Sequence, residues 1–139
     1  MTESVSKKGF AAIVAAGGSG TRFSQDSVQE TGTALPKQFL TLKGRPLYFW
    51  SLRELILNNS IDNIVMVAPT QILDDLRQQL NEIRRELATT KTIAVIEGGG
   101  SRQESVFKGM LYLKKLDRQP EYVLIHDAAR PLLTRLIAL

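Results

Sequence analysis

Short apolar runs alternate with helix-like segments along this chain, and this alternation restricts the fold more than any other feature of the sequence. Four runs are continuously apolar rather than strictly alternating, which is typical of strands buried on both faces. They cover residues 10–15, 61–69, 91–97 and 121–126. Buried strands that alternate with helices form mostly parallel sheets covered by helices on both sides. The sequence therefore predicts an α/β fold.

Three segments between these runs are predicted to be helices. They cover residues 46–59, with Pro46 in the first turn, 71–87 and 101–116. The last segment begins with Ser101, and Glu104 follows three residues later, which is the pattern of a helix capping box. Val106, Met110 and Leu113 recur at helical spacing, so we expect them to form the buried face of this helix.

Composition narrows the classes of protein. A chain of 139 residues suits one domain, and the absence of cysteine excludes disulfides and thiolate metal sites. The net charge of +4 is mild, which favours a small anionic ligand over a nucleic acid. No apolar run approaches the roughly 20 residues of a membrane span, and residues 10–16 are short for a secretion signal. We expect a cytoplasmic protein with no nucleic-acid or membrane partner.

A glycine-rich loop, "AAGGSGTRF" at residues 15–23, follows the first predicted strand. A nicotinamide fingerprint would need a glycine where Phe23 stands, and the Gly-Lys-Ser/Thr of a P-loop is missing. A flexible linker is the alternative, but linkers do not follow a buried strand inside a compact domain. The glycines let backbone N–H groups approach an anion, and Arg22 places a cation beside them. This pattern favours a phosphate-binding loop.

Two further loops rich in small and charged residues follow the third and fourth predicted strands, at residues 98–106 and 126–131. Parallel strands place their carboxyl ends at one edge of the sheet, where ligands of such folds bind. We therefore expect the three loops to form one site. A single histidine at a strand end, such as His126, is more often structural than catalytic.

Four blocks, in order, resemble the 2-C-methyl-D-erythritol 4-phosphate cytidylyltransferase family: "AGGSGTRF", "PKQFLTLKGRPL", "GGGSRQESVFKG" and "VLIHDAARP". Together they span most of residues 10–131. The resemblance implies a Rossmann-like three-layer sandwich of the nucleotidyltransferase type, with residues 1–139 as the N-terminal part of a single domain. The C-terminal portion, which in this family carries the acceptor site and the dimerisation arm, is then absent from the chain.

The resemblance also implies roles for individual residues. Arg22 and Lys37 match the two catalytic cations of the family. The matching nucleotide-binding residues are Ala15, Ala16, Gly17, Gly18, Ser19, Gly20, Gly99, Gly100, Arg102, Ser105, Asp127, Ala128 and Arg130. Gly99, Gly100 and Ser105 match the stretch that reads cytosine, and Arg102 is expected to support this loop. Asp127 matches the residue near the ribose and the divalent ion, which is expected to be Mg²⁺.

Such enzymes join CTP to a sugar or polyol phosphate, here 2-C-methyl-D-erythritol 4-phosphate, and release pyrophosphate. We expect a homodimer for the full-length protein, whereas this chain alone contains half a site. The stretch between Arg22 and Lys37 is longer than usual for the family, and its polar residues 24–34 are predicted to close over the triphosphate. A ribitol-5-phosphate cytidylyltransferase and a non-catalytic nucleotide-binding module are the alternatives. A hexose-1-phosphate nucleotidylyltransferase fits less well, because "HDAARP" is foreign to that group.

Overall fold

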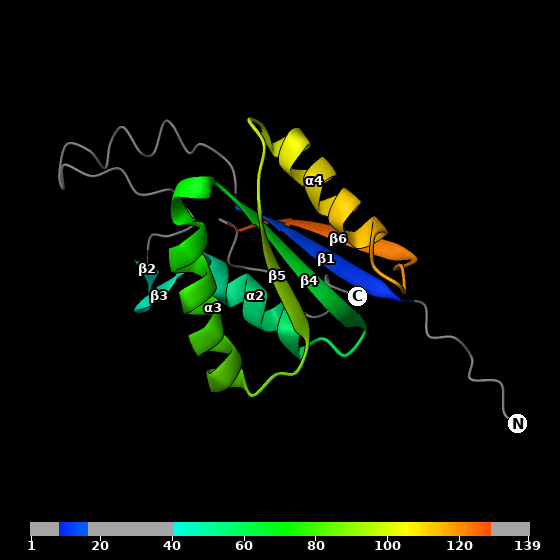
Figure 1. Ribbon diagram of the computed structural model, residues 1–139. Helices are drawn as coiled ribbons and strands as arrows, with labels where there is room; N and C mark the ends of the chain where they lie inside the picture. Colours follow the sequence, from blue (N-terminus) through cyan, green and yellow to red (C-terminus); the bar gives the residue numbers. More distant parts are fainter. Residues whose placement is uncertain (1–8, 17–40, 129–139) are drawn as a thin grey trace, which may run out of the picture.

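The centre of the molecule is a four-stranded parallel sheet, described here by a computed structural model that covers residues 9–16 and 41–128. Its strands are β1 (Phe10–Ala15), β4 (Ile61–Ala68), β5 (Thr92–Glu97) and β6 (Tyr122–Asp127). They lie in the order β5-β4-β1-β6, and every neighbouring pair is parallel (Figure 1). The four predicted strands are therefore confirmed to within one residue at each end.

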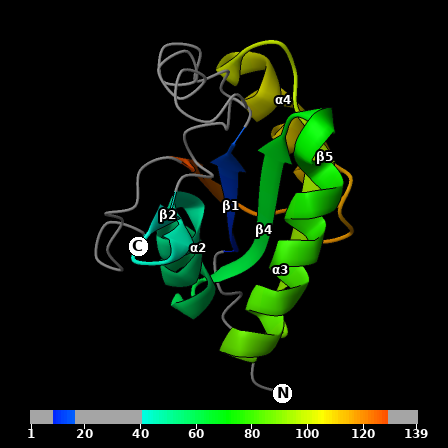
Figure 2. The same cartoon turned by 90° about the vertical axis from the view of Figure 1, so that its left-hand side faces the viewer.

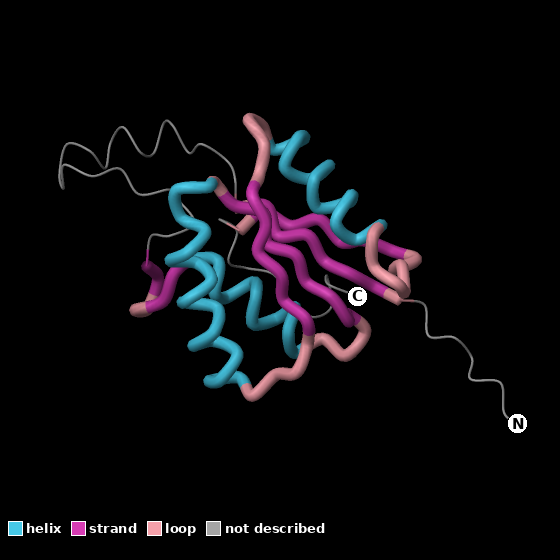
Figure 3. The backbone as a smooth tube through the Cα atoms, viewed as in Figure 1, coloured by secondary structure: helices cyan, strands magenta, loops and turns pink. Residues whose placement is uncertain are grey.

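Helices cover both faces of this sheet. They are α2 (Leu47–Leu57), α3 (Leu73–Leu87), which follows the 3-10 turn η2 (Thr70–Ile72), and α4 (Arg102–Lys114). Helices α2 and α3 lie on one face and α4 lies on the other, and α3 runs alongside β5 (Figures 2 and 3). The expected three-layer α/β fold is confirmed. None of the helices in the described part of the chain is long and apolar enough to span a bilayer.

Strand β1 is the centre of the core because it contributes side chains to both faces. Ala11 and Ile13 pack on the α4 side, whereas Ala12 and Val14 pack on the side of α2 and α3. All four side chains are completely buried. Successive residues of a strand point to opposite faces, so a strand covered on both sides must be apolar throughout.

A short antiparallel hairpin precedes α2. It consists of β2 (Thr41–Leu42) and β3 (Arg45–Pro46). Lys43 and Gly44 form the turn with φ angles of 53° and 77°, the positive values that tight hairpin turns require. The sequence pattern placed Pro46 in the first helical turn, but Pro46 pairs with Thr41 in the hairpin and α2 begins one residue later.

The buried face of α4 differs from the expected one. Ser105, Gly109 and Leu113 face the sheet, whereas Met110 is 43% exposed. A Cβ atom added to Gly109 would lie 3.0 Å from Cγ2 of Ile13. The helix approaches β1 so closely at Gly109 that a side chain there would crowd Ile13. The prediction is confirmed for Leu113 and wrong for Met110, and Val106 is half-buried.

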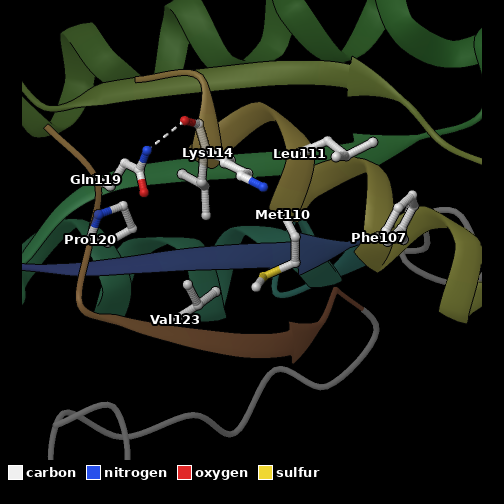
Figure 4. A pocket seen from close by; sticks show the side chains of 8 residues that line it. Phe107, Met110, Leu111, Lys114, Gln119, Pro120 and Val123 are labelled. Atoms are coloured by element: carbon white, nitrogen blue, oxygen red, sulfur yellow. Dashed lines mark hydrogen bonds between the residues drawn. The ribbon is translucent and has the colours of Figure 1, made fainter. Parts of the chain in front are cut away.

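Three large apolar side chains of α4, Phe107, Met110 and Leu111, are exposed. Phe107 is 61% exposed, and with Met110 and Leu111 it lines a pocket of about 320 Å³ between the outer face of α4 and the start of β6 (Figure 4). Val123 and Pro120 line the opposite side of the pocket. None of the predicted site residues lines this pocket.

Candidate active site

The carboxyl ends of the parallel strands bring the starts of the three predicted loops together. Three backbone hydrogen bonds extend the ladders just beyond the strand ends. They run from Ala16 N to Val67 O (2.7 Å), from Gly98 N to Ala68 O (2.8 Å) and from Ala128 N to Ala15 O (3.0 Å). All three loops therefore leave the same edge of the sheet from fixed positions, as expected.

The strand order reverses between β1 and β6. The chain proceeds outward from β1 through β4 to β5, and α4 then returns it to the other side of β1. Ala15 and Asp127 are partners across this junction, at the ends of their strands. Open parallel sheets bind ligands in the crevice outside the strand ends at such a reversal point. The position of Asp127 is therefore the position where a ligand is expected.

Side chains from the first two turns of α4 hold the loop at residues 98–101. Oγ of Ser105, which is fully buried, accepts a hydrogen bond from the N–H of Gly99 at 3.0 Å. Oε2 of Glu104 accepts one from the N–H of Gly100 at 2.9 Å. Nζ of Lys108 donates to the carbonyl oxygen of Gly98 at 3.1 Å. The loop is thus anchored to the helix that follows it.

Two glycines of this loop are required by the closeness of α4. A Cβ atom on Gly98 would lie 2.7 Å from Oγ of Ser105, and one on Gly99 would lie 2.3 Å from Cγ of Glu104. Both distances are shorter than real contacts allow. The loop therefore presents bare backbone at the edge of the sheet, and a ligand can approach its peptide groups closely.

The capping box predicted at the start of α4 is confirmed in one half. Oγ of Ser101 accepts the N–H of Glu104 at 3.1 Å, as an N-cap should. The carboxylate of Glu104 bonds the N–H of Gly100 rather than that of Ser101. Glu104 therefore supports the glycine loop, one residue before the position that the pattern predicted.

An ion pair connects the second loop with the third. Nε of Arg102 donates to Oδ1 of Asp127 at 2.7 Å, and the two side chains are 55% and 31% exposed. Arg102 was expected to support the glycine loop, and its guanidinium instead bonds the carboxylate at the end of β6. Partly exposed pairs of this kind contribute only about 1 kcal/mol or less to stability, so the pair matters chiefly for orienting Asp127.

The alanines at the strand ends are buried. Ala16 and Ala128 are 1% and 0% exposed, and Ala15 is 8% exposed. Ala16 and Ala128 belong to the core on the side of α2 and α3. Their side chains are turned into the protein, so only their peptide groups can face a nucleotide.

The remaining predicted site residues lie outside the described part of the chain. They are Gly17, Gly18, Ser19, Gly20, Arg22, Lys37 and Arg130, together with the polar stretch at residues 24–34. Their predicted roles stay predictions.

Sequence reasoning missed two residues at this site. Glu104 was noticed only as part of a capping pattern, and Lys108 was not singled out. Glu104 directly precedes Ser105 and Lys108 follows it by three positions, so Glu104 and Lys108 are four residues apart on α4. This spacing was a signal that could have revealed them, because residues four apart lie on the same helix face.

The carboxylates of the site determine whether it could hold a metal ion. Within residues 9–16 and 41–128, three or more histidine, cysteine or acidic side chains nowhere gather into a cluster that could hold a metal. Mg²⁺ bound with a triphosphate usually takes one or two carboxylates, and phosphate oxygens and water complete its shell. The single carboxylate of Asp127 fits this arrangement.

Comparison with known proteins identifies the family. A family model described as 2-C-methyl-D-erythritol 4-phosphate cytidylyltransferase matches residues 10–138. The chain belongs to this family.

Individual relatives agree with this assignment. The cytidylyltransferase of Clostridium novyi (strain NT) is 38% identical over 120 residues, which are 86% of this chain and 46% of the relative. That of Clostridium botulinum (strain Loch Maree / Type A3) is 35% identical over 122 residues, which are 88% of this chain and 47% of the relative. This chain thus spans less than half the length of these two curated relatives.

A solved structure supports the fold of this cytidylyltransferase family member. The 4-diphosphocytidyl-2C-methyl-D-erythritol synthase of Anaerococcus prevotii DSM 20548 is 25% identical and superimposes with a TM-score of 0.71. The match covers 96% of this chain and 49% of that chain. The family resemblance inferred from the four sequence blocks is thereby confirmed.

Proposed function

We propose that the protein transfers the cytidylyl group of CTP to 2-C-methyl-D-erythritol 4-phosphate, in the synthesis of isoprenoid precursors. One observation supports this most strongly. The glycine loop held by α4 and the Arg102–Asp127 pair meet at the carboxyl edge of the sheet, beside the end of β1. The type of reaction is inferred from the family to which the chain belongs.

In this reaction an oxygen of the acceptor phosphate attacks the α-phosphorus of CTP. The bond from the α-phosphorus to its bridging oxygen breaks, and pyrophosphate leaves with the electron pair. Such transfers depend on positioning and on charge stabilisation rather than on covalent chemistry by the protein. Arg22 and Lys37 are proposed to balance the negative charge of the phosphates during the attack.

The loop at residues 98–100 is proposed to receive the cytosine, and the buried Ser105 supports this loop from α4. Its peptide groups carry no side chain that could shield them, and the fixed hydrogen bonds to α4 keep them in place. The N–H groups of Gly98, Gly99 and Gly100 already donate to groups of the protein, so the carbonyl oxygens of the loop are proposed to accept from the amino group of cytosine. A small pocket is proposed to exclude purines.

Asp127 is proposed to hold Mg²⁺, and Arg102 orients this carboxylate. The ion would neutralise part of the triphosphate charge. In the structure, Nε of Arg102 bonds one carboxylate oxygen, Oδ1.

The complete protein is further proposed to be a cytoplasmic homodimer. The cysteine-free sequence is compatible with a reducing compartment.

Nucleotide selectivity tests the proposal. CTP and ATP are titrated into the complete protein with Mg²⁺ by calorimetry, and turnover is followed as pyrophosphate release. We expect tighter binding of CTP, with turnover on 2-C-methyl-D-erythritol 4-phosphate. Equal affinity for ATP would contradict the cytidylyl assignment. Turnover only with ribitol 5-phosphate would show that ribitol 5-phosphate, and not 2-C-methyl-D-erythritol 4-phosphate, is the acceptor. Binding of CTP without turnover on either acceptor would favour a non-catalytic nucleotide-binding module.

A further inference from the structure

One peptide group in the glycine loop is held at both ends by the same helix. The carbonyl oxygen of Gly98 accepts from Nζ of Lys108 at 3.1 Å, and the N–H of Gly99 donates to Oγ of Ser105 at 3.0 Å. These two atoms belong to the single peptide plane between Gly98 and Gly99. Side chains of α4 thus bond both the carbonyl oxygen and the N–H of this peptide group.

These two hydrogen bonds matter because the residues on both sides of the peptide group are glycines. Glycine has access to far more backbone conformations than other residues, so a peptide between two glycines can rotate at little steric cost. Rotation would exchange the positions of the carbonyl oxygen and the N–H. A ligand that reads this backbone would then meet a donor in place of an acceptor.

The two anchors differ in character. Ser105 is fully buried, and its place is set by the packing of α4 against β1, where Gly109 meets Ile13. Lys108 is a long, flexible side chain that is only partly buried. Its ammonium group makes a charge-assisted hydrogen bond, which is stronger than a neutral one. Loss of Lys108 would release the carbonyl end of the peptide and leave the packed helix intact.

We propose that Lys108 is a positioning residue for nucleotide binding, which locks the Gly98–Gly99 peptide in its binding orientation together with Ser105. The proposal rests on the proposed function, because that function assigns the loop to the cytosine of CTP. Lys108 acts through the peptide and does not touch the reacting phosphates. Its removal is therefore expected to change the affinity for the nucleotide and not the rate of the chemical step.

Three variants of the complete protein test this role. Lys108→Met removes the ammonium group and keeps an unbranched chain, and Lys108→Arg retains charge and donors. Lys114→Met is the matched control, because it removes the same charge from an exposed position at the other end of α4. Each variant is titrated with CTP and Mg²⁺, and kcat and the KM for CTP are measured separately.

We expect Lys108→Met to weaken CTP binding and raise its KM by about tenfold, the order expected for one hydrogen bond from a charged group. Its kcat should stay within about twofold, since Lys108 is not expected to stabilise the transition state. Lys108→Arg should restore most of the affinity, and Lys114→Met should bind CTP like the wild type. In the protein without nucleotide, the amides of residues 98–101 should exchange hydrogen faster in Lys108→Met than in the wild type.

Unchanged CTP affinity and unchanged exchange in Lys108→Met would overturn the proposal and leave the proposed function standing. An equal loss of affinity in Lys114→Met would also overturn it, because the effect would then come from net charge. If the wild type bound no CTP, the proposed function itself would fail, and the nucleotide role of Lys108 would fail with it. The exchange measurement distinguishes these cases, because it shows whether Lys108 holds the Gly98–Gly99 peptide in the absence of nucleotide.

Discussion

Gly109 is the point at which α4 touches the central strand, and replacing it with alanine measures how tightly the helix is seated. The added Cβ atom would lie 3.0 Å from Cγ2, 3.1 Å from Cδ1 and 3.3 Å from Cγ1 of Ile13. Ile13 is fully buried in the middle of the sheet, so it has little room to move. Overpacking of this kind costs about 2 kcal/mol, whereas alanine in place of glycine favours the helix by about 1 kcal/mol. We expect Gly109→Ala to lower the free energy of unfolding by about 1 kcal/mol.

A double-mutant cycle with Ile13→Val isolates the contact. Valine lacks Cδ1, one of the three crowded atoms, so it makes room for the new methyl group. Ile13→Val alone should cost about 1 kcal/mol, and the two changes together should cost less than their sum by about 0.5–1 kcal/mol. Urea unfolding, followed by far-UV circular dichroism, measures the free energy of unfolding of the complete wild-type protein, both single variants and the double variant. A neutral Gly109→Ala, or strictly additive effects, would refute the close approach of α4 to β1.

Two further predictions concern other parts of the molecule. Burial raises the pKa of the Tyr48 hydroxyl above its ordinary 10.0, and the nearby Glu82 adds to this. The protonated form is then favoured in the folded state, so wild-type stability should fall as the pH rises above 10.0, and Tyr48→Phe should lack this loss in urea unfolding at pH 9 and 11. Arg22→Ala should lower turnover by about 10²–10³ with little effect on folding. Near-native turnover in that variant would remove Arg22 from the catalytic role.

The patterns that the sequence revealed correctly are local ones. Continuous apolar runs placed the four strands because a strand between two helical layers must be apolar on both faces. Ser101 marked the start of α4 because an N-cap needs only a hydroxyl and the N–H three residues later. That the three loops begin at one edge of the sheet also followed from the sequence, since parallel strands place all their carboxyl ends at one edge. The four motif blocks identified the family.

The contacts that shape the site depend on distances that no local pattern contains. The ion pair of Arg102 with Asp127 joins residues 25 positions apart, and only the pairing of β6 with β1 brings them together. Leu113 was predicted correctly on the inner face of α4, but Met110 was not, because a large apolar residue marks a buried face only when there is room for it. A Cβ atom at position 109 would crowd Ile13, and the helix places Ser105, Gly109 and Leu113 on its inner face and leaves Met110 exposed. The same close seating brings Ser105 and Lys108 to the glycine loop, and this is why the tertiary structure decided which side chains hold it.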